Sequence, residues 1–187
     1  MKGYWDRRYL SGASSGGGSV GRTRDWKWGL IDEHVEISGK SVLDVGCGDL
    51  SFWENRDCKR YTGLDFSDVV IEKNLLRRPD WSFRCTDASE PADLSTQIVL
   101  CLDVLFHVLE DPVYEGILRN LSRWTEEKLF IYTWWRSPFR EKDSDGWYQY
   151  YRPLMESVSL LKPLALVGEY KYTPVGAMYV FKRETNP

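Results

Sequence analysis

Short apolar segments alternate with amphipathic ones through most of the chain. The segments that read as buried strands cover 41–45, 61–65, 81–87, 97–103 and 128–135. Apolar residues at helical spacing predict helices over 25–37, 67–76, 111–124 and 151–161. Ser67 is the expected N-cap of the second of these helices, and Asp111-Pro112 the expected cap and first-turn proline of the third. Apolar strands that alternate with helices predict a mostly parallel sheet covered on both faces.

The last part of the chain has a different pattern. Residues 164–172 and 177–182 read as two strands, joined by Thr173-Pro174-Val175-Gly176. So short a connection suits an antiparallel hairpin. The expected fold class is α/β, a Rossmann-like, doubly wound, mostly parallel seven-stranded sheet that ends in an antiparallel hairpin strand. We expect one domain over 1–187, with its core in 25–187.

The first 24 residues read as a flap or lid that precedes this core. Residues 11–19, SGASSGGGS, have the composition of a flexible loop, and Tyr4 and Trp5 lie before them. A segment of this kind can close over a bound ligand and exclude water. A frayed chain end is the alternative.

Composition narrows the function classes. The net charge is −3, which disfavours nonspecific binding of nucleic acid. The charged, aromatic start lacks the apolar region of a secretory signal. The longest apolar stretch, 98–109, is too short for a bilayer and contains Asp103 and His107. The four scattered cysteines and two histidines lack metal-site spacing, so we expect no bound metal. We also expect a cytoplasmic protein with reduced thiols and no membrane partner.

A glycine turn follows the first strand, in the sequence SVLDVGCGD. Gly46 and Gly48 allow the backbone to approach a ligand closely. Asp65 lies 19 residues beyond Gly46, at the end of the next strand. A strand, a glycine turn and an acid at this distance predict a nucleoside site in which the acid accepts the ribose hydroxyls.

The acids beside the turn indicate which nucleoside binds. Asp44 and Asp49 flank the glycines and would repel a pyrophosphate, and Ser51 stands at the third position of the dinucleotide glycine motif. A ligand with a ribose and a cationic group fits better, because opposite charges attract most strongly where water is excluded. S-adenosylmethionine has both features.

The ordered set VLDVGCGD, YTGLDFS, FRCTDASE and VLCLDVLFHVLEDP resembles the class I S-adenosylmethionine-dependent methyltransferase family. The resemblance covers about 25–135, and the last two strands resemble the closing hairpin of the family. One departure is Leu50, which stands where the family commonly has a third glycine.

The resemblance implies a role for each matching position. Asp44, Gly46 and Gly48 would contact the methionine part of the cofactor, and Cys47 and Asp49, in the same turn, are further candidate cofactor-binding residues. Asp65 would hold the ribose and Phe66 would contact the adenine. The remaining positions implied by the resemblance are Asp87 and Ala88 at the adenine edge, and Asp103 and Val104 below the methyl group.

The expected chemistry is an in-line displacement in which the protein aligns the nucleophile and excludes water. His107, four residues past the fourth strand, is the candidate base, and it forms the candidate catalytic set with Asp103. Packing or a loop hydrogen bond is the other interpretation of His107. Trp134, Trp135 and Tyr148 are candidate acceptor-binding residues, with ordinary packing as their alternative.

The leading hypothesis is therefore methyl transfer to an oxygen or nitrogen of a small or medium-sized acceptor. RNA and protein acceptors remain open. The alternatives are a cofactor-binding protein without turnover and, less favoured, a nicotinamide-dependent oxidoreductase.

Overall fold

The structure is a computed structural model that describes residues 1–136 and 149–184. The chain forms two compact units, Met1–Asp87 and Ala88–Pro187, and each is described by itself. The expectation of one domain over 1–187 stays a prediction.

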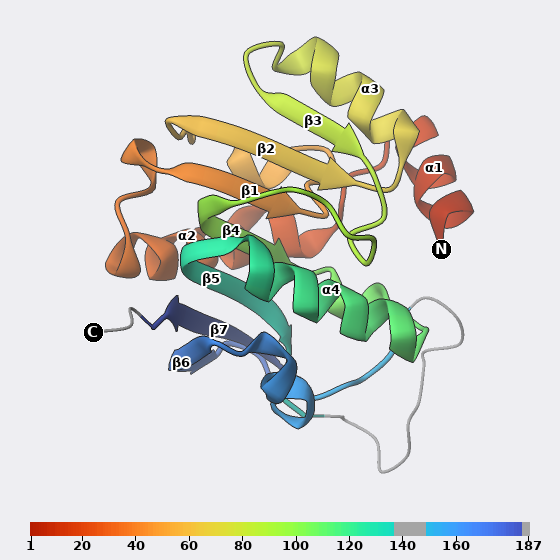
Figure 1. The fold of residues 1–187 in the computed structure, drawn as a ribbon. Coiled ribbons are helices and arrows are strands. Elements are labelled where there is room, and N and C mark those ends of the chain that lie inside the picture. Colours follow the sequence, from red (N-terminus) through yellow and green to blue (C-terminus); the bar gives the residue numbers. More distant parts are fainter. Residues whose placement is uncertain (137–148, 185–187) are drawn as a thin grey trace. The chain divides into compact units, whose positions relative to one another are not determined.

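The first unit is built around three parallel strands in the order β3-β2-β1 (Figure 1). The strands are β1 (Ser41–Val45), β2 (Arg60–Asp65) and β3 (Ser82–Cys85). The α-helices are α1 (Lys2–Leu10), α2 (Gly21–His34) and α3 (Asp68–Arg77), and the 3-10 turns are η1 (Gly17–Ser19), η2 (Ile37–Gly39) and η3 (Ser51–Trp53). All five residues of β1 are buried, as its apolar sequence predicts.

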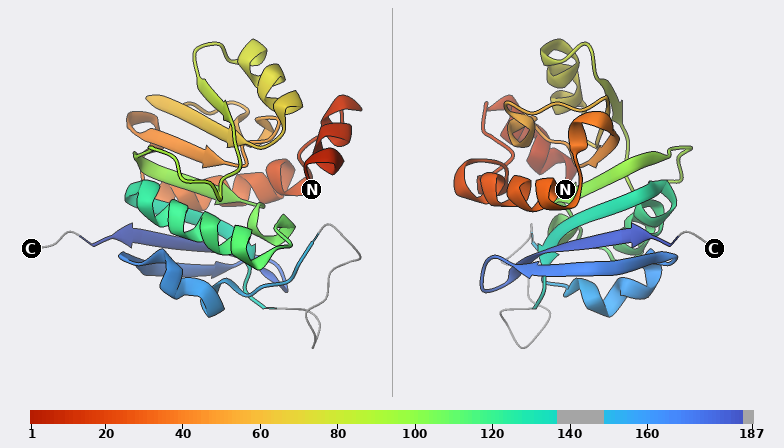
Figure 2. Two further views of the ribbon diagram at one scale, coloured as in Figure 1. Left: turned by 45° about the vertical axis from the view of Figure 1, so that its right-hand side comes forward. Right: turned by 90° about the vertical axis from the view of Figure 1, so that its left-hand side faces the viewer.

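The second unit has four strands in the order β4-β5-β7-β6. They are β4 (Thr96–Leu102), β5 (Thr125–Trp134), β6 (Leu164–Lys171) and β7 (Gly176–Arg183). β4 and β5 are parallel, whereas β7 is antiparallel to both β5 and β6, as the views in Figure 2 show. The unit also contains η4 (Leu105–His107), α4 (Asp111–Trp124) and η5 (Leu154–Leu161).

The predicted fold class is confirmed: seven strands and intervening helices form a Rossmann-like α/β fold with an antiparallel C-terminal hairpin. Ser67 caps α3 as predicted, since its hydroxyl accepts the Val70 backbone N–H at 3.4 Å. The cap predicted at Asp111 is wrong by one residue, because Glu110 is the N-cap of α4 and its side chain makes no capping bond. The last predicted helix is the 3-10 segment η5.

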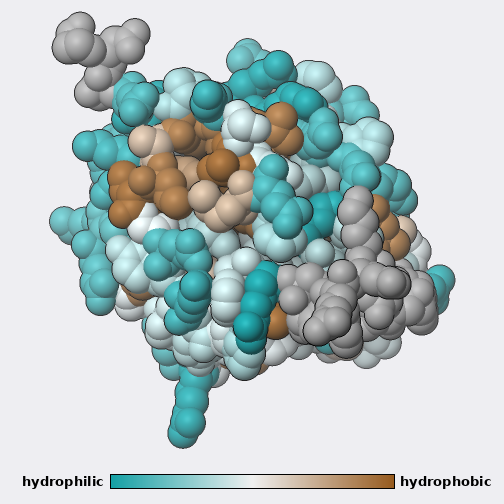
Figure 3. Space-filling view, turned by 90° about the horizontal axis from the view of Figure 1, so that it is seen from below, coloured by the Kyte–Doolittle hydropathy of each residue, from teal (hydrophilic) through white to brown (hydrophobic). Residues whose placement is uncertain are grey.

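β6 is an edge strand with apolar exposure. Leu166 and Val167 on β6, and Met155 on η5, are exposed. The space-filling view from below shows brown, apolar side chains gathered in one area of this face (Figure 3). The pairing of β6 with β7 is irregular between Leu166 and Gly168. An irregularity of this kind on an edge strand hinders pairing with another chain.

None of the helices in the described part of the chain has the length and apolar character needed to cross a membrane. In the same residues, no group of three or more His, Cys, Asp or Glu side chains is arranged to hold a metal ion.

Candidate functional site

The glycine turn that follows β1 has left-handed backbone geometry. Gly46 has φ 75° and Gly48 has φ 51°. The N–H groups of Gly46 and Cys47 both donate to the Leu64 carbonyl, at 2.8 and 2.9 Å, which ties the turn to β2. Leu50 also lies in the left-handed region, with φ 61°. The backbone therefore keeps the left-handed conformation at Leu50, where the resemblance predicts a glycine. A residue other than glycine pays a free-energy cost in this conformation.

Gly48 lies at the most crowded point of the turn. A Cβ atom built at this position would overlap the hydroxyl of Ser15. The Gly48 carbonyl accepts the side-chain amide of Asn74 at 2.7 Å, and its N–H donates to Asp65. Sequence reasoning missed Asn74, and its only signal was a polar residue on the otherwise apolar face of α3. The thiol of Cys47 is buried beside it, and burial raises the pKa of that thiol.

Asp65 ends β2 with a buried carboxylate. Its Oδ2 accepts the Gly48 N–H at 3.1 Å, and its Oδ1 accepts the Ser67 N–H at 2.9 Å. Burial raises its pKa to about 6, and the nearby charge of Asp6 adds to the effect. The Asp65 carbonyl accepts the Thr86 N–H at 2.9 Å, so the segment after β3 lies beside this acid. Asp87, the next residue of that segment, is exposed. Phe66, which directly follows Asp65 in the chain, is half-buried.

Asp44 is a second buried carboxylate, inside β1. Its Oδ2 accepts both the Trp53 indole N–H at 2.8 Å and the Tyr61 hydroxyl at 2.9 Å. Burial raises its pKa to about 6, and the negative charge of Asp65 contributes in the same direction. Within residues 1–87, the contacts recorded for Asp44 and Asp65 include no lysine or arginine. Two buried acids without a basic partner suit a cationic ligand, so the residues present fit the group expected from the sequence.

The N-terminal segment packs against this turn. Ser15 donates through its N–H to Asp49 Oδ2 at 3.1 Å and through its hydroxyl to Asp49 Oδ1 at 2.8 Å. Asp49 is thus held by the N-terminal segment, and both of its oxygens have a partner in that segment. The Tyr9 carbonyl accepts the ammonium of Lys73, and Asp6 accepts the Ser67 hydroxyl at 2.6 Å. These bonds fix α1 beside α3, and the lid interpretation of residues 1–24 stays a prediction.

In the second unit, the residues expected near the methyl group follow β4 directly. Asp103 has φ 62°, and its N–H donates to the Tyr132 carbonyl at 3.1 Å. Val104 is the N-cap of η4, and its carbonyl accepts the His107 N–H at 2.8 Å. The Asp103, Val104 and His107 side chains are half-buried. Ala88, at the start of the same unit, accepts the side-chain amide of Asn120 at 2.9 Å through its carbonyl.

An aromatic stack lies next to His107. Trp134 is stacked against Phe106 and against Tyr151, with ring centroids 4.6 and 5.2 Å away, and the His107 ring is 4.7 Å from that of Phe106. The Trp134 indole N–H is buried and has no hydrogen-bond partner among the described residues. Phe106 was not predicted as part of this cluster.

The other two predicted acceptor residues do not join this stack. Trp135 packs at the turn between β6 and β7, where its indole N–H donates to the Thr173 carbonyl at 3.3 Å. The charged groups of Arg136 and Lys171 lie over its ring, at 4.6 and 4.0 Å. Tyr148 lies outside the described residues.

Arg152 is a positioning residue that sequence reasoning missed. Its guanidinium donates to the carbonyls of Val108 and Leu109 and to Asp111 Oδ1, the last at 2.7 Å. It also lies over the Tyr150 ring, 4.1 Å from the centroid. These contacts tie the chain after η4 to the segment that supplies Tyr151. An arginine beside aromatic residues was the available signal, but its partners are about forty residues away.

Part of the chain is similar in sequence to known proteins. Residues 42–128 match the family model described as "Methyltransferase domain". The tRNA U34 carboxymethyltransferase of Pseudomonas aeruginosa (strain LESB58) is 64% identical over 62 residues, which are 33% of this chain and 16% of the relative. The chain thus spans about one sixth of the length of the curated relatives it matches.

Solved structures show the same fold. The N-methyltransferase NodS from Bradyrhizobium japonicum WM9, in complex with S-adenosyl-l-homocysteine, has 16% identity and a TM-score of 0.66 over 87% of this chain and 88% of that chain. The [4+2]-cyclase SpnF has 13% identity and a TM-score of 0.70 over 99% and 95%.

The family match covers the glycine turn, the end of β2 and the β4 segment. The similarity to the solved structures extends beyond these residues. Both agree with the resemblance found in the sequence. Over residues 42–128 the chain is therefore similar to a methyltransferase domain, in agreement with the resemblance of its sequence to class I S-adenosylmethionine-dependent methyltransferases.

Proposed function

We propose that this chain transfers the methyl group of S-adenosylmethionine to an oxygen or nitrogen atom of an acceptor. The observation that carries the proposal is the pair of buried carboxylates, Asp44 and Asp65, at the glycine turn of the first unit. Each has a pKa of about 6, raised chiefly by burial, and neither contacts a basic side chain within residues 1–87. A cationic nucleoside would compensate these charges, whereas a pyrophosphate would add to them.

The first unit supplies the proposed donor-binding residues. Asp65 accepts the ribose hydroxyls, and Asp44 faces the positive charge of the methionine part. The turn at Gly46, Cys47 and Gly48 contributes backbone N–H and carbonyl groups. Phe66 and Asp87 are proposed to contact the adenine. The sulfonium of the donor supplies an activated methyl group with a neutral leaving group.

Asp49 has a different proposed role. Because both of its oxygens accept bonds from Ser15, it holds the N-terminal segment over the turn. The segment then excludes water from the donor, a condition that strengthens the electrostatic contacts of Asp44 and Asp65.

The second unit carries the proposed acceptor residues. Asp103 and Val104 lie at the carboxyl end of β4, and His107 follows in η4. His107 is proposed to take the proton that the nucleophile loses. The indole N–H of Trp134, which has no partner in residues 1–136 and 149–184, is proposed to donate to an oxygen or nitrogen of the acceptor, because a buried donor without a partner costs free energy that a bound ligand restores.

The proposed acceptor is a small or medium-sized molecule, since the aromatic stack beside His107 offers one hydrogen-bond donor, the Trp134 indole N–H. A tRNA acceptor is the second candidate. It is favoured by the relatives that share 62 residues with this chain and are named tRNA U34 carboxymethyltransferases.

One labelling experiment separates these acceptors. The chain is incubated with S-adenosylmethionine that carries a labelled methyl group and with either a metabolite extract or purified total tRNA. Label in a small molecule supports the leading proposal, and label in tRNA supports the second. Binding of the donor with label in neither fraction would contradict both and favour a cofactor-binding protein without turnover.

A further inference from the structure

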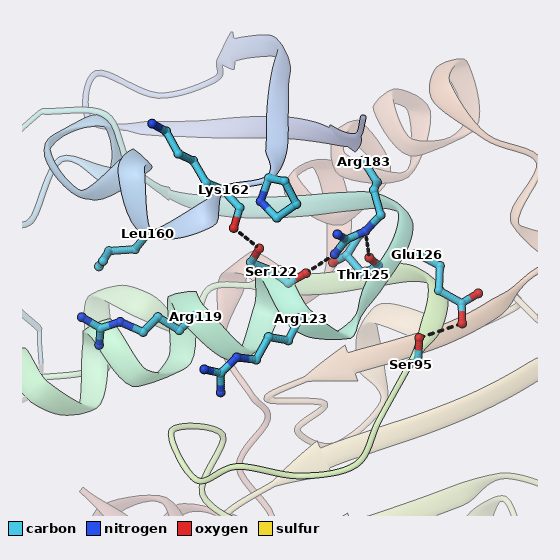
Figure 4. Close-up of a pocket in the computed structure, with 10 residues that line it drawn as sticks. Ser95, Arg119, Ser122, Arg123, Thr125, Glu126, Leu160, Lys162 and Arg183 are labelled. Atoms are coloured by element: carbon cyan, nitrogen blue, oxygen red, sulfur yellow. Dashed lines mark hydrogen bonds between the residues drawn. The ribbon is translucent and has the colours of Figure 1, made fainter. Parts of the chain in front are cut away.

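A cavity of about 610 Å³ opens in the second unit, and its lining does not include Asp103, Val104 or His107. Ser95 precedes β4, and Thr125 and Glu126 begin β5, so the cavity lies at the amino-terminal ends of these strands. Asp103 follows the opposite end of β4. The lining residues, most of them labelled in Figure 4, are Ser95, Arg119, Ser122, Arg123, Thr125, Glu126, Leu160, Lys162, Pro163 and Arg183.

The lining is strongly basic. It contains Arg119, Arg123, Lys162 and Arg183 but one acid, Glu126. Because the whole chain has a net charge of −3, this local excess of cations is not a consequence of composition. A concentration of one sign of charge in a concave site attracts ligands of the opposite sign.

Two of the four cations already have partners. Arg119 forms an ion pair with Glu115 at 2.8 Å. Arg183 donates to the carbonyls of Thr125 and Ser122 at the end of α4, where the negative end of the helix dipole favours a cation. A structural role therefore accounts for Arg119 and Arg183.

The other two cations have no such role. Among the described residues, no hydrogen bond or ion pair is recorded for the charged groups of Arg123 and Lys162, which are exposed. The backbone of Lys162 is nevertheless fixed, because its carbonyl accepts the Ser122 hydroxyl at 2.8 Å. The single acid, Glu126, forms no recorded ion pair with either of them among the described residues and accepts the Ser95 hydroxyl at 2.7 Å at the other side of the cavity (Figure 4).

We propose that this cavity binds an anion with several phosphate groups, held by Arg123 and Lys162. Arginine matches phosphate through paired N–H donors, and lysine binds it as a point charge. In Figure 4 the side chains of Arg123 and Lys162 extend in different directions, which fits an extended anion better than a single small one. The volume falls within the range of about 300–1,000 Å³ of small-molecule sites. The phosphates belong either to a free phosphorylated metabolite or to the backbone of RNA.

The test compares wild type with the double variant Arg123→Gln/Lys162→Gln. The control, Arg22→Gln/Lys59→Gln, removes the same charge from two exposed positions in the first unit. Calorimetry measures binding of inorganic tripolyphosphate and of a short single-stranded RNA, at one fixed ionic strength. We expect the site variant to bind at least tenfold more weakly than wild type and the control, because it loses two charge-assisted contacts.

The two probes also distinguish the sources. Loss of tripolyphosphate binding with no RNA binding in any protein supports a free phosphorylated ligand. Loss of RNA binding, with RNA the tighter ligand of wild type, supports an RNA backbone. Equal affinities in the site variant and the control, or no binding of either probe to wild type, would overturn the proposal. S-adenosylhomocysteine binding, measured in the same three proteins, tests the donor site separately and should not change.

Discussion

The two buried carboxylates make donor affinity depend on pH. Asp44 and Asp65 have a pKa of about 6 in the folded protein, compared with an ordinary value of 3.8. S-adenosylmethionine carries a permanent positive charge, so it binds best when both carboxylates are ionised. Below about pH 6, protons compete with the donor for these groups. We therefore expect the donor affinity to fall as the pH is lowered from about 7 to about 5.

The size of the effect follows from the number of titrating groups. Each group that must lose its proton lowers the affinity about tenfold per pH unit below its pKa. Between about pH 7 and about pH 5, one group gives a loss of about tenfold and two groups give a loss of about a hundredfold. In the Asp44→Asn variant, Asp65 is the one carboxylate of this pair that still titrates. The donor affinity of the variant should therefore depend less on pH than that of wild type.

The stability of the unliganded protein should change in the opposite direction. A pKa that is higher in the folded state means that the folded protein takes up protons first. The free energy of unfolding therefore gains a contribution as the pH falls through about 6 towards 3.8, and this contribution is lost as the pH rises again. For a pKa that is raised by about 2 units, this contribution to the free energy of unfolding amounts to about 3 kcal/mol per group. Asp44→Asn should remove the contribution of Asp44 and leave that of Asp65.

Calorimetric titration of the donor and urea unfolding, each measured across this pH range, test the reasoning together. Asp80→Asn is the matched control, because Asp80 is an exposed carboxylate that pairs with Arg78. A donor affinity that is independent of pH in wild type would refute the reasoning. So would a pH dependence of the same size in Asp44→Asn and in wild type.

The other predictions concern single side chains. Asp65→Ala should weaken S-adenosylhomocysteine at least tenfold in a calorimetric titration, since a charge-assisted bond contributes about 1.5–3 kcal/mol; Asp80→Ala should bind like wild type, and an unchanged affinity of Asp65→Ala would remove its ribose role. His107→Ala should lower the turnover of labelled donor and keep its affinity, and wild-type turnover would exclude His107 as the base. Ser15→Ala removes two of the three hydrogen bonds between Ser15 and Asp49 and should raise the dissociation rate of the donor in stopped-flow experiments; an unchanged rate would argue against a lid. Trp134→Phe should raise the KM of the acceptor more than it changes kcat, and equal kinetics would exclude the indole N–H from acceptor binding.

Much of the fold was predictable because its signals are local. The apolar runs of β1 and β4, the glycine turn, and Asp65 at the end of β2 all follow from short stretches of sequence. The Thr173–Gly176 turn also predicted the antiparallel hairpin, which the pairing of β6 with β7 confirms.

Features that depend on long-range contacts were not predictable. The α1 sequence KGYWDRRYL is weakly amphipathic, and its helix is held beside α3 through Asp6 and Ser67. Asp49 looked like a ligand contact beside the glycines, but a partner 34 residues away takes both of its oxygens. The ring contacts of Trp134 depend on Phe106 and Tyr151, which come from separate segments.

The central claim is that the acids at the glycine turn select a cationic nucleoside donor over a phosphate-bridged one. Thermal unfolding of the wild-type chain with S-adenosylmethionine, and separately with NAD, tests it most directly, since a ligand that binds the folded state raises the melting temperature. The account predicts that S-adenosylmethionine raises it and that NAD does not. Stabilisation by NAD, with none by S-adenosylmethionine, would contradict it.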